Sequence, residues 1–319
     1  MTTLGPVRDR PADPGDGDVP PSIAIPMVAA TVAVWGFASP LIKAASVGGE
    51  AMAFYRLWIG ALALLAVVVG AMRRPVRAAV WPWGLAAGAL FGVNLLLFVS
   101  AVKTTTVANA TLIGALQPAI VLLVAGRLFG ESVSARDVAC AAGAIAGVGI
   151  VIAGSAGTPE WHPAGDLMAV GAVLTFTAYF LVTKRVRATG GTLEYMTIVH
   201  VVAAVVVTPA VAFRPGDLGG LDTRDVLTIL FFALVSGTLG QVVIGWAQRY
   251  VDVSVSSLMM LGVPVVASVA AWAMLDEALG PVQAAGGLVT LGAIGGMLWR
   301  RPGGQVAMEE PAAVAAGAD

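Results

Sequence analysis

A small number of polar side chains stand inside long apolar stretches of this sequence, and their chemistry suits recognition of a small molecule. Four of them are amides: Asn94, Asn109, Gln117 and Gln241. An amide both donates and accepts hydrogen bonds, which suits a polar ligand that is uncharged or zwitterionic. In apolar surroundings each amide needs a partner, so it either joins two helices or lines a wet cavity.

Two aromatic residues complete the candidate site. The Tyr179 hydroxyl can donate and accept hydrogen bonds, and the Trp35 ring offers an apolar face to a ligand. Packing is an equal alternative for Trp35, and bonding between helices is the alternative for the polar side chains. We therefore predict a substrate-binding site that contains Trp35, Asn94, Asn109, Gln117, Tyr179 and Gln241.

Two residues within the apolar stretches, His200 and Arg56, can carry a positive charge, which the amide and aromatic side chains cannot. A histidine changes charge near a pH of about 6.5, so His200 is the candidate for proton coupling, with packing as its alternative. Arg56 can extend its guanidinium to the nearby outer surface, or it can attract an anionic group on a substrate. No Asp or Glu lies between residues 23 and 43, so the first apolar stretch offers no carboxylate for binding a proton or a cation.

The sequence does not indicate enzymatic chemistry. No GxSxG, HExxH, Walker A or GxGxxG motif occurs in a suitable context. Cys140 is the only cysteine, so no disulfide can form within the chain, and His162 and His200 lack the spacing of metal ligands. We therefore expect neither an enzyme nor a protein that holds a metal or a cofactor.

The composition indicates the solvent in which these side chains must work. Of the 319 residues, 58% are hydrophobic and only 12% are charged, and the mean hydropathy is +0.88. Soluble domains carry about 25% charged residues, so lipid is the natural solvent for this chain. The net charge of −1 gives no information about nucleic acid, but the sequence has no basic patch with interleaved aromatic residues, so we expect no nucleic-acid partner.

Apolar stretches long enough to cross a bilayer recur along the chain, since one crossing needs about 20 apolar residues. They predict an all-α membrane protein with ten transmembrane helices, flanked by cytoplasmic tails at 1–22 and 300–319. The first tail is rich in Pro, Gly and Asp, which predicts disorder. The predicted helices cover residues 23–43, 51–71, 83–102, 107–127, 135–154, 167–186, 192–213, 226–247, 254–274 and 281–299.

The basic residues predict that both termini are cytoplasmic. In this orientation 13 of the 18 Lys and Arg residues face the cytoplasm, four face outwards, and Arg56 lies within a helix. This asymmetry agrees with the positive-inside rule, and we expect a multi-pass protein of the inner membrane. The cytoplasmic residues are Arg8, Arg10, Arg73, Arg74, Arg77, Arg127, Arg136, Lys184, Arg185, Arg187, Arg249, Arg300 and Arg301, and the outer ones are Lys43, Lys103, Arg214 and Arg224.

The two halves of the chain repeat each other. Residues 118–131 read PAIVLLVAGRLFGE and residues 264–277 read PVVASVAAWAMLDE, so a proline precedes a glutamate by thirteen positions in both, at an offset of 146. Five helices per half is an odd number, so the two halves insert upside down relative to each other, as in many secondary transporters. We expect inverted five-helix repeats at 23–154 and 167–299, joined by an external loop at 155–166.

The prolines and glutamates of these segments have structural interpretations. Pro118 and Pro264 lie about 15 Å into their predicted helices, near the midplane, where a proline frees a backbone carbonyl. Each either kinks its helix for packing, acts as a hinge, or exposes a carbonyl to a cavity. Glu131 and Glu277 follow the ends of two helices, where they cap the next helix or, as the alternative, carry protons.

The sequence resembles the drug/metabolite transporter superfamily and, within it, the EamA-type branch. The resemblance extends from about residue 25 to residue 299, and it implies ten helices in two EamA-like repeats with a substrate path between them. It also implies export or import of amino acids and other small metabolites. The motifs that carry it are Trp35-Gly36, Lys43, Phe54-Tyr55-Arg56, Ala101–Ala108 (AVKTTTVA) and the two Pro–Glu segments.

We therefore expect a permease that exports a small polar or zwitterionic metabolite by alternating access. A multidrug exporter is the nearest alternative, although relatives of that kind place a Glu in the first helix. A lipid-modifying enzyme would need a nucleophile, base or metal cluster, and a receptor or scaffold would not need an inverted repeat. Glycines spaced by four in 135–154 and 281–299 favour close helix packing, either as scaffold or at the face of a homodimer.

Overall fold

The computed structural model describes residues 23–71, 81–104, 113–130, 133–154, 162–187, 192–212, 218–275 and 280–299. These residues form helices and short connections, with no strand among them, and the predicted all-α class is confirmed. Asn109, Glu131 and Glu277 lie outside the described residues, so their expected roles stay predictions.

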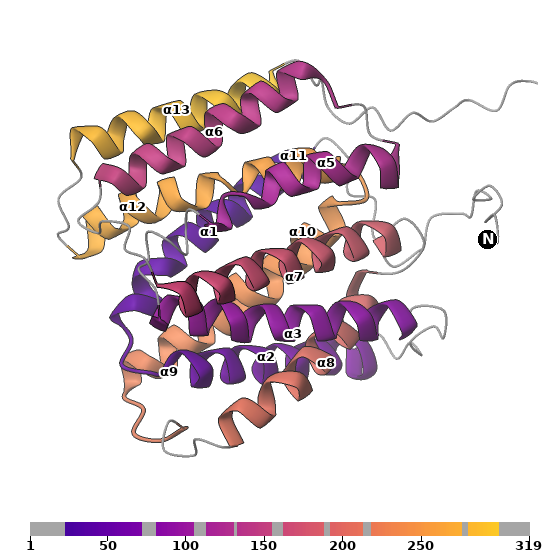
Figure 1. The fold of residues 1–319 in the computed structure, drawn as a ribbon. Helices are drawn as coiled ribbons and strands as arrows, with labels where there is room; N and C mark the ends of the chain where they lie inside the picture. The colour runs from indigo at the N-terminus through magenta and orange to yellow at the C-terminus, as the bar shows by residue number, and fades with distance from the viewer. Residues whose placement is uncertain are drawn as a thin grey trace, which may run out of the picture.

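Figure 1 labels the helices along the chain, coloured from indigo at the N-terminus to yellow at the C-terminus. The first half contains α1 (Ala24–Ala44), α2 (Gly49–Leu65), η2 (Ala66–Ala71), α3 (Trp81–Thr104), α5 (Gln117–Phe129) and α6 (Ala135–Gly154). The second half contains α7 (Pro163–Arg187), α8 (Thr192–Ala212), α9 (Thr223–Leu230), η5 (Phe231–Leu239), α10 (Gly240–Ala247), α11 (Val253–Met259), α12 (Gly262–Leu275) and α13 (Pro281–Leu298). The segments η2 and η5 are π-helical.

Eight helices in the described part of the chain are long and apolar enough to cross a membrane, counting α2–η2, α9–η5–α10 and α11–α12 as one crossing each. Two shorter apolar helices, Ala24–Ala38 and Gln117–Phe129, fall within the first and fourth predicted spans. The chain is thus a multi-pass membrane protein. A full set of ten crossings stays a prediction, because these two segments are shorter than the thickness of a bilayer requires.

Local sequence features fix several helix ends. The Asp222 side chain accepts a hydrogen bond from the Asp225 N–H at 2.7 Å, which caps the start of α9. Gly130 ends α5 with a φ of 67°, in the left-handed region that glycine adopts without strain. At the start of α13, the Gln283 side chain accepts the Gly280 N–H at 2.8 Å.

The fourth and ninth predicted helices are broken rather than continuous. In the fourth, the chain turns at residues 115–116 and α5 begins at Gln117, one residue before Pro118. In the ninth, α11 ends at Met259 and α12 begins at Gly262, two residues before Pro264. A proline lacks an N–H and its ring collides with the carbonyl four residues earlier, so both helices break at the equivalent point.

A second difference from the sequence prediction concerns the π-helical segments. The eighth predicted helix, 226–247, is α-helical at both ends but π-helical through η5, and the second ends in η2. An apolar pattern does not reveal such segments, because a wider turn changes the register of the side chains without changing their composition. The register of η5 matters for the candidate site described below.

Equivalent helices of the two halves pack against each other. The pairs are α2 with α8, α5 with α11, and α6 with α13, and the last pair lies side by side at one edge of the molecule (Figure 1). Two further contacts match each other across the halves, since α3 packs on α7 just as the α9–η5–α10 helix packs on α1. This pairing is the one that a two-fold relation between the halves requires.

Helices α6 and α13 run antiparallel. On α6 and α13, Arg136 donates to Gly296 O at 2.6 Å near one end, and a Cβ on Gly154 would touch Gln283 near the other. Between them, Gly147 lies directly against Thr290. An antiparallel pair has its two-fold axis perpendicular to the helices, as inverted repeats in a membrane require. Gly147 and Gly154 therefore serve the contact between the halves, and a homodimer face formed by the other glycines of these helices stays a prediction.

The buried apolar side chains form two clusters. One joins α1, α5, α6, α10, α11 and the end of α13, and the other joins α2, α3, α7 and α8. Helix α7 contributes to both, because Phe180 belongs to the first cluster and Tyr179 to the second. Phe176 packs against both clusters, so the polar residues of α7 lie where the two clusters meet.

Candidate substrate-binding site

A hydrogen-bonded pair between two helices forms the centre of the candidate site. The Tyr179 hydroxyl of α7 donates to Gln241 Oε1 of α10 at 3.0 Å, and both side chains are buried. The Tyr179 ring stacks on the Phe91 ring of α3, with centroids 4.9 Å apart. The first half of the chain thus supplies an aromatic wall to a polar pair from the second half.

Arg56 of α2 adds a cation to this cluster. Its guanidinium carbon lies 4.6 Å from the Phe232 ring centroid and 5.7 Å from that of Phe91, and the side chain is half-buried. Arg56 lies about 10 Å from the start of α2. Its guanidinium contacts two aromatic rings inside the protein, whereas one of the two expectations was that it extends to the outer surface. A guanidinium in a membrane helix costs about 2.5–3.5 kcal/mol, and desolvated cation–π contacts offset about 2 kcal/mol of that cost.

His200 of α8 lies beside the same ring. Its ring centroid is 6.0 Å from that of Phe91, and the side chain is buried. Nδ1 lies 2.8 Å from Met196 O, and because a carbonyl only accepts, Nδ1 carries a proton. His200 therefore belongs to the same cluster as Arg56 and Tyr179, because all three contact Phe91. Proton coupling through His200 stays a prediction.

Trp35 reaches the cluster from α1. Its indole Nε1 donates to Ser236 O at 2.7 Å, and the side chain is half-buried. The ring lies against Gly240, where a Cβ would come within 2.6 Å of Nε1. Since Gly240 precedes Gln241, the indole lies beside the helix that carries the central amide. The donor of Trp35 is used by the protein, so only its ring face is available to a ligand.

The remaining predicted residues lie elsewhere. Asn94 is buried and donates to Ala172 O at 2.8 Å, which joins α3 to α7 and matches the helix-joining alternative. Gln117 opens α5, which packs on α11 and α7, and its Nε2 is buried without a hydrogen-bond partner in the described structure. The structure therefore brings Tyr179 and Gln241 together, with Trp35 beside them.

The prolines have the positions expected of hinges. Pro118 and Pro264 each follow a break in a helix. The carbonyl that Pro264 would free belongs to Met260, and it accepts the Val263 N–H at 3.0 Å. That carbonyl therefore has a donor from the protein, which argues against an exposed carbonyl, while a kink for packing and a hinge both stay predictions for Pro264.

Sequence reasoning missed two parts of the cluster. Phe91 lies three residues before Asn94 on the same face of α3, and this spacing could have suggested it. Phe232 belongs to η5, and no sequence signal places it over Arg56. In the described part of the chain, no group of three or more His, Cys, Asp or Glu residues could hold a metal ion.

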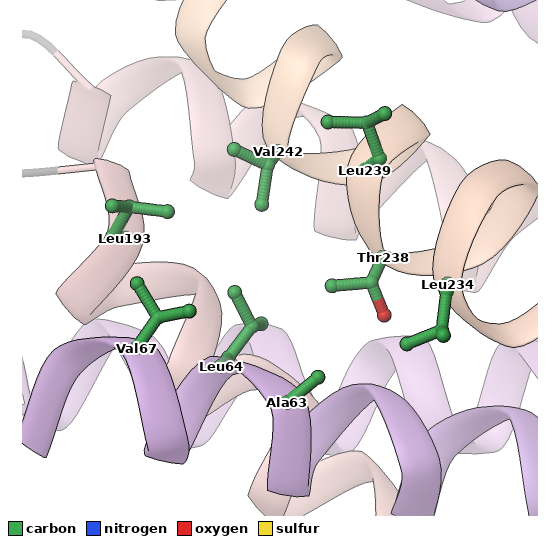
Figure 2. Close-up of a pocket in the computed structure, with 8 residues that line it drawn as sticks. All are labelled: Ala63, Leu64, Val67, Leu193, Leu234, Thr238, Leu239 and Val242. Atoms are coloured by element: carbon green, nitrogen blue, oxygen red, sulfur yellow. The ribbon is translucent and has the colours of Figure 1, made fainter. Parts of the chain in front are cut away.

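A cavity of about 240 Å³ lies beside the cluster, between α2, η2, α8, η5 and α10 (Figure 2). Apart from Thr238, the side chains that line the cavity are apolar. Val67, Leu234 and Leu239 are also exposed at the surface of the helix bundle. Gly60 separates Thr238 from His200, since a Cβ there would touch both side chains. The cavity is lined by Ala63, Leu64, Val67, Leu193, Leu234, Thr238, Leu239 and Val242, none of which was predicted as a site residue.

These features define a multi-pass membrane protein made of two related helical halves with a polar cluster between them. The model of the EamA-like transporter family matches the chain twice, over residues 22–153 and 163–299. The chain belongs to this family, and the resemblance read from its motifs is confirmed. Members of the family are membrane transporters of the drug/metabolite type and not enzymes.

One solved structure that is similar to this chain is a crystal structure of a protein with 17% sequence identity. The two superpose with a TM-score of 0.73 over 87% of this chain and 97% of the other. At this identity the similarity shows a shared fold. No curated protein matches the chain.

Proposed function

We propose that this protein is a secondary transporter that exports a small polar or zwitterionic metabolite by alternating access. The observation that carries the proposal is the buried Tyr179–Gln241 pair, stacked on Phe91 from the other half of the chain. Amide and hydroxyl groups at this depth can exchange their mutual hydrogen bond for bonds to a polar ligand. The family places the chain among transporters, and the cluster offers chemistry for a substrate.

The arrangement of the halves supports alternating access. The cluster draws side chains from both halves, so a movement of one half against the other opens it towards one side of the membrane. At one end, the Ser46 N–H donates to Asp225 Oδ1 at 3.0 Å, and the Ser46 hydroxyl donates to Asp225 Oδ2. At the other, Arg185 lies 5.8 Å from the Trp83 ring centroid. These contacts join the halves at opposite ends and are the ones that must alternately separate.

A multidrug exporter is less well supported. Such carriers take apolar cations, and the described residues of the cluster include a cation, Arg56, and no Asp or Glu. A cationic drug placed against Tyr179 would meet a like charge in surroundings of low dielectric constant. The charge of the cluster therefore favours zwitterionic or anionic solutes over cationic drugs.

Transport assays in proteoliposomes test the proposal. Untargeted metabolite profiling of a deletion strain and an overproducer supplies the candidate solutes, and flux is then measured with the purified full chain. We expect Tyr179→Phe and Gln241→Leu to weaken substrate affinity about 10-fold at equal expression, because each removes a hydrogen bond from the cluster. Absence of flux for every solute in wild-type proteoliposomes would contradict the proposal.

Two matched variants make the assay specific. Tyr250→Phe removes a tyrosine hydroxyl from a half-buried ring that packs on Trp246, and it should leave transport unchanged. Asn94→Leu removes an amide that joins α3 to α7, and it should lower stability while leaving affinity unchanged. An effect of Asn94→Leu on affinity equal to that of Gln241→Leu would show that helix packing alone controls transport.

The orientation is part of the same proposal. We place both termini in the cytoplasm and the protein in the inner membrane, on the asymmetry of 13 basic residues against four. Reporter fusions after Arg77, Arg187 and Arg301 should all report a cytoplasmic location. A periplasmic signal after Arg301 would contradict an even number of crossings. Export is tested by comparing uptake into inside-out and right-side-out vesicles.

A further inference from the structure

The cluster contains a cation that has no anion beside it in the described structure. The guanidinium of Arg56 contacts the rings of Phe91 and Phe232, and a Cβ on Gly237 would lie 2.8 Å from its Nε. Among the described residues, Arg56 forms no ion pair and no hydrogen bond. Ring faces attract the positive charge but accept no strong hydrogen bonds, so the guanidinium retains N–H donors for another molecule.

The position of Arg56 connects these donors to the proposed binding residues. Phe91 contacts both Arg56 and Tyr179, so a ligand group bound at the guanidinium would lie one ring away from the Tyr179–Gln241 pair. Gly237 keeps this space open, because any side chain there would displace the guanidinium. Arg185 and Arg249 also lie over aromatic rings, Trp83 and Tyr250 respectively. Arg185 differs from Arg56 because its side chain is exposed.

We infer that Arg56 binds a carboxylate of the transported molecule, so that the substrates are small carboxylates, with or without an amino group. The planar guanidinium presents paired N–H donors that match the two oxygens of a carboxylate. A carboxylate would also supply the counter-charge that a cation inside a membrane protein normally has. This inference rests on the proposed transport function, and it adds the chemical group by which the site selects its substrate.

The test compares acids with their amides. The probes are the twenty proteinogenic L-amino acids, succinate and lactate, each beside the corresponding carboxamide. Binding to the purified full chain is followed by thermal stabilisation, and flux is followed in proteoliposomes. We expect wild-type protein to bind and transport one or more acids, with an affinity about 10- to 100-fold higher than for the matching amide.

Variants of Arg56 assign the preference to this side chain. Arg56→Met keeps the length of the side chain and should remove the difference between acid and amide. Arg56→Lys keeps the charge without the planar donors and should give an intermediate preference, and it decides the question if Arg56→Met does not fold. Arg185→Met is the matched control, since it also removes an arginine from an aromatic ring, and whatever its effect on the rate of turnover, it should keep the wild-type ratio of affinities for acid and amide.

The outcomes separate this inference from the proposed function. Equal affinity for acid and amide in the wild type, or a preference for the acid that persists in Arg56→Met, would overturn the inference. Transport of only neutral or cationic solutes would also overturn it and leave the proposed transport function standing. Absence of flux for every solute would overturn both. An acid preference that is lost in Arg56→Met and kept in Arg185→Met would establish it.

Discussion

Helix α3 and its counterpart in the second half, α9–η5–α10, occupy equivalent places in the two repeats, and both carry glycines at their contacts. In α3 these glycines admit another helix backbone. A Cβ on Gly88 would lie 2.8 Å from Val199 O and 2.6 Å from Val202 Cβ of α8. The glycine therefore sets the distance between two helices, as small residues do in membrane bundles.

In α9–η5–α10 the glycines admit side chains instead. A Cβ on Gly237 would lie 2.8 Å from Arg56 Nε, and one on Gly240 would lie 2.6 Å from Trp35 Nε1. Both neighbours belong to the first half, and both lie against the cluster described above. Equivalent helices therefore differ in what their glycines admit: α3 admits the backbone of another helix, and its partly π-helical counterpart admits the side chains of Arg56 and Trp35.

The largest effect on stability is expected in α3. Gly88→Ala should lower the free energy of unfolding by about 1–3 kcal/mol, because a backbone atom of α8 cannot move aside. Gly292→Ala is the matched control in α13, where no atom lies within 4 Å, and it should raise stability by up to about 1 kcal/mol. Thermal melting in detergent measures both, and equal melting temperatures would contradict the comparison.

The counterpart glycine should affect transport more than stability. Gly240→Ala should displace the Trp35 indole and break its bond to Ser236 O, a loss of about 1 kcal/mol. The higher helix propensity of alanine, about 1 kcal/mol, offsets that loss. We therefore expect near wild-type melting with a several-fold loss of substrate affinity, measured as KM in proteoliposomes. A melting curve like that of Gly88→Ala would assign a scaffold role to Gly240 as well.

A smaller change isolates the Trp35 hydrogen bond. Trp35→Phe keeps an aromatic face but removes the donor to Ser236 O, so stability should fall by about 0.5–1.5 kcal/mol. Transport should be retained, because only the ring face was free for a ligand. Trp272→Phe, at an exposed position on α12, is the control and should change neither property. Loss of transport without loss of stability would show that the indole N–H itself serves the substrate.

The smallest effect is expected where the counterpart helix begins. Ser46→Ala removes the hydroxyl donor to Asp225 but leaves the backbone N–H bond of 3.0 Å, so stability should fall by about 0.5–1 kcal/mol. Turnover should rise, because this contact must separate when the halves move. Ser268→Ala, whose hydroxyl bonds only to Pro264 O four residues earlier, is the control. Slower turnover in Ser46→Ala would contradict a role in opening.

The sequence predicted the features that depend on local chemistry. Apolar stretches located the helices, and the kink or hinge expected at Pro118 and Pro264 falls where the structure breaks both helices. The free-energy cost of burying a polar side chain in a membrane led to the selection of Tyr179 and Gln241, and the structure places these two residues together. The same argument selected Asn94, which joins two helices, because the cost of burial is identical whether the partner is a ligand or a backbone carbonyl.

The features that the sequence could not predict depend on distant contacts. Phe91 and Phe232 come from different halves, and only the packing of α2 between them places Arg56 over both rings. The π-helical register of η5 sets which residues face Trp35 and Arg56, and it has no signature in hydrophobicity. The scaffold could therefore be derived from sequence, while the contacts that place Arg56 against Phe91 and Phe232 required the structure.

The antiparallel pairing of equivalent helices has a consequence for the ancestry of the chain. Because α2 meets α8, α5 meets α11 and α6 meets α13, each half presents the same surfaces that it receives from the other. A surface of that kind is isologous, the geometry by which two identical subunits form a C2 dimer. This single chain thus encloses an arrangement that a shorter protein would build from two copies inserted in opposite directions. Within one chain a substitution changes one half alone, whereas in a dimer of identical copies it would change both.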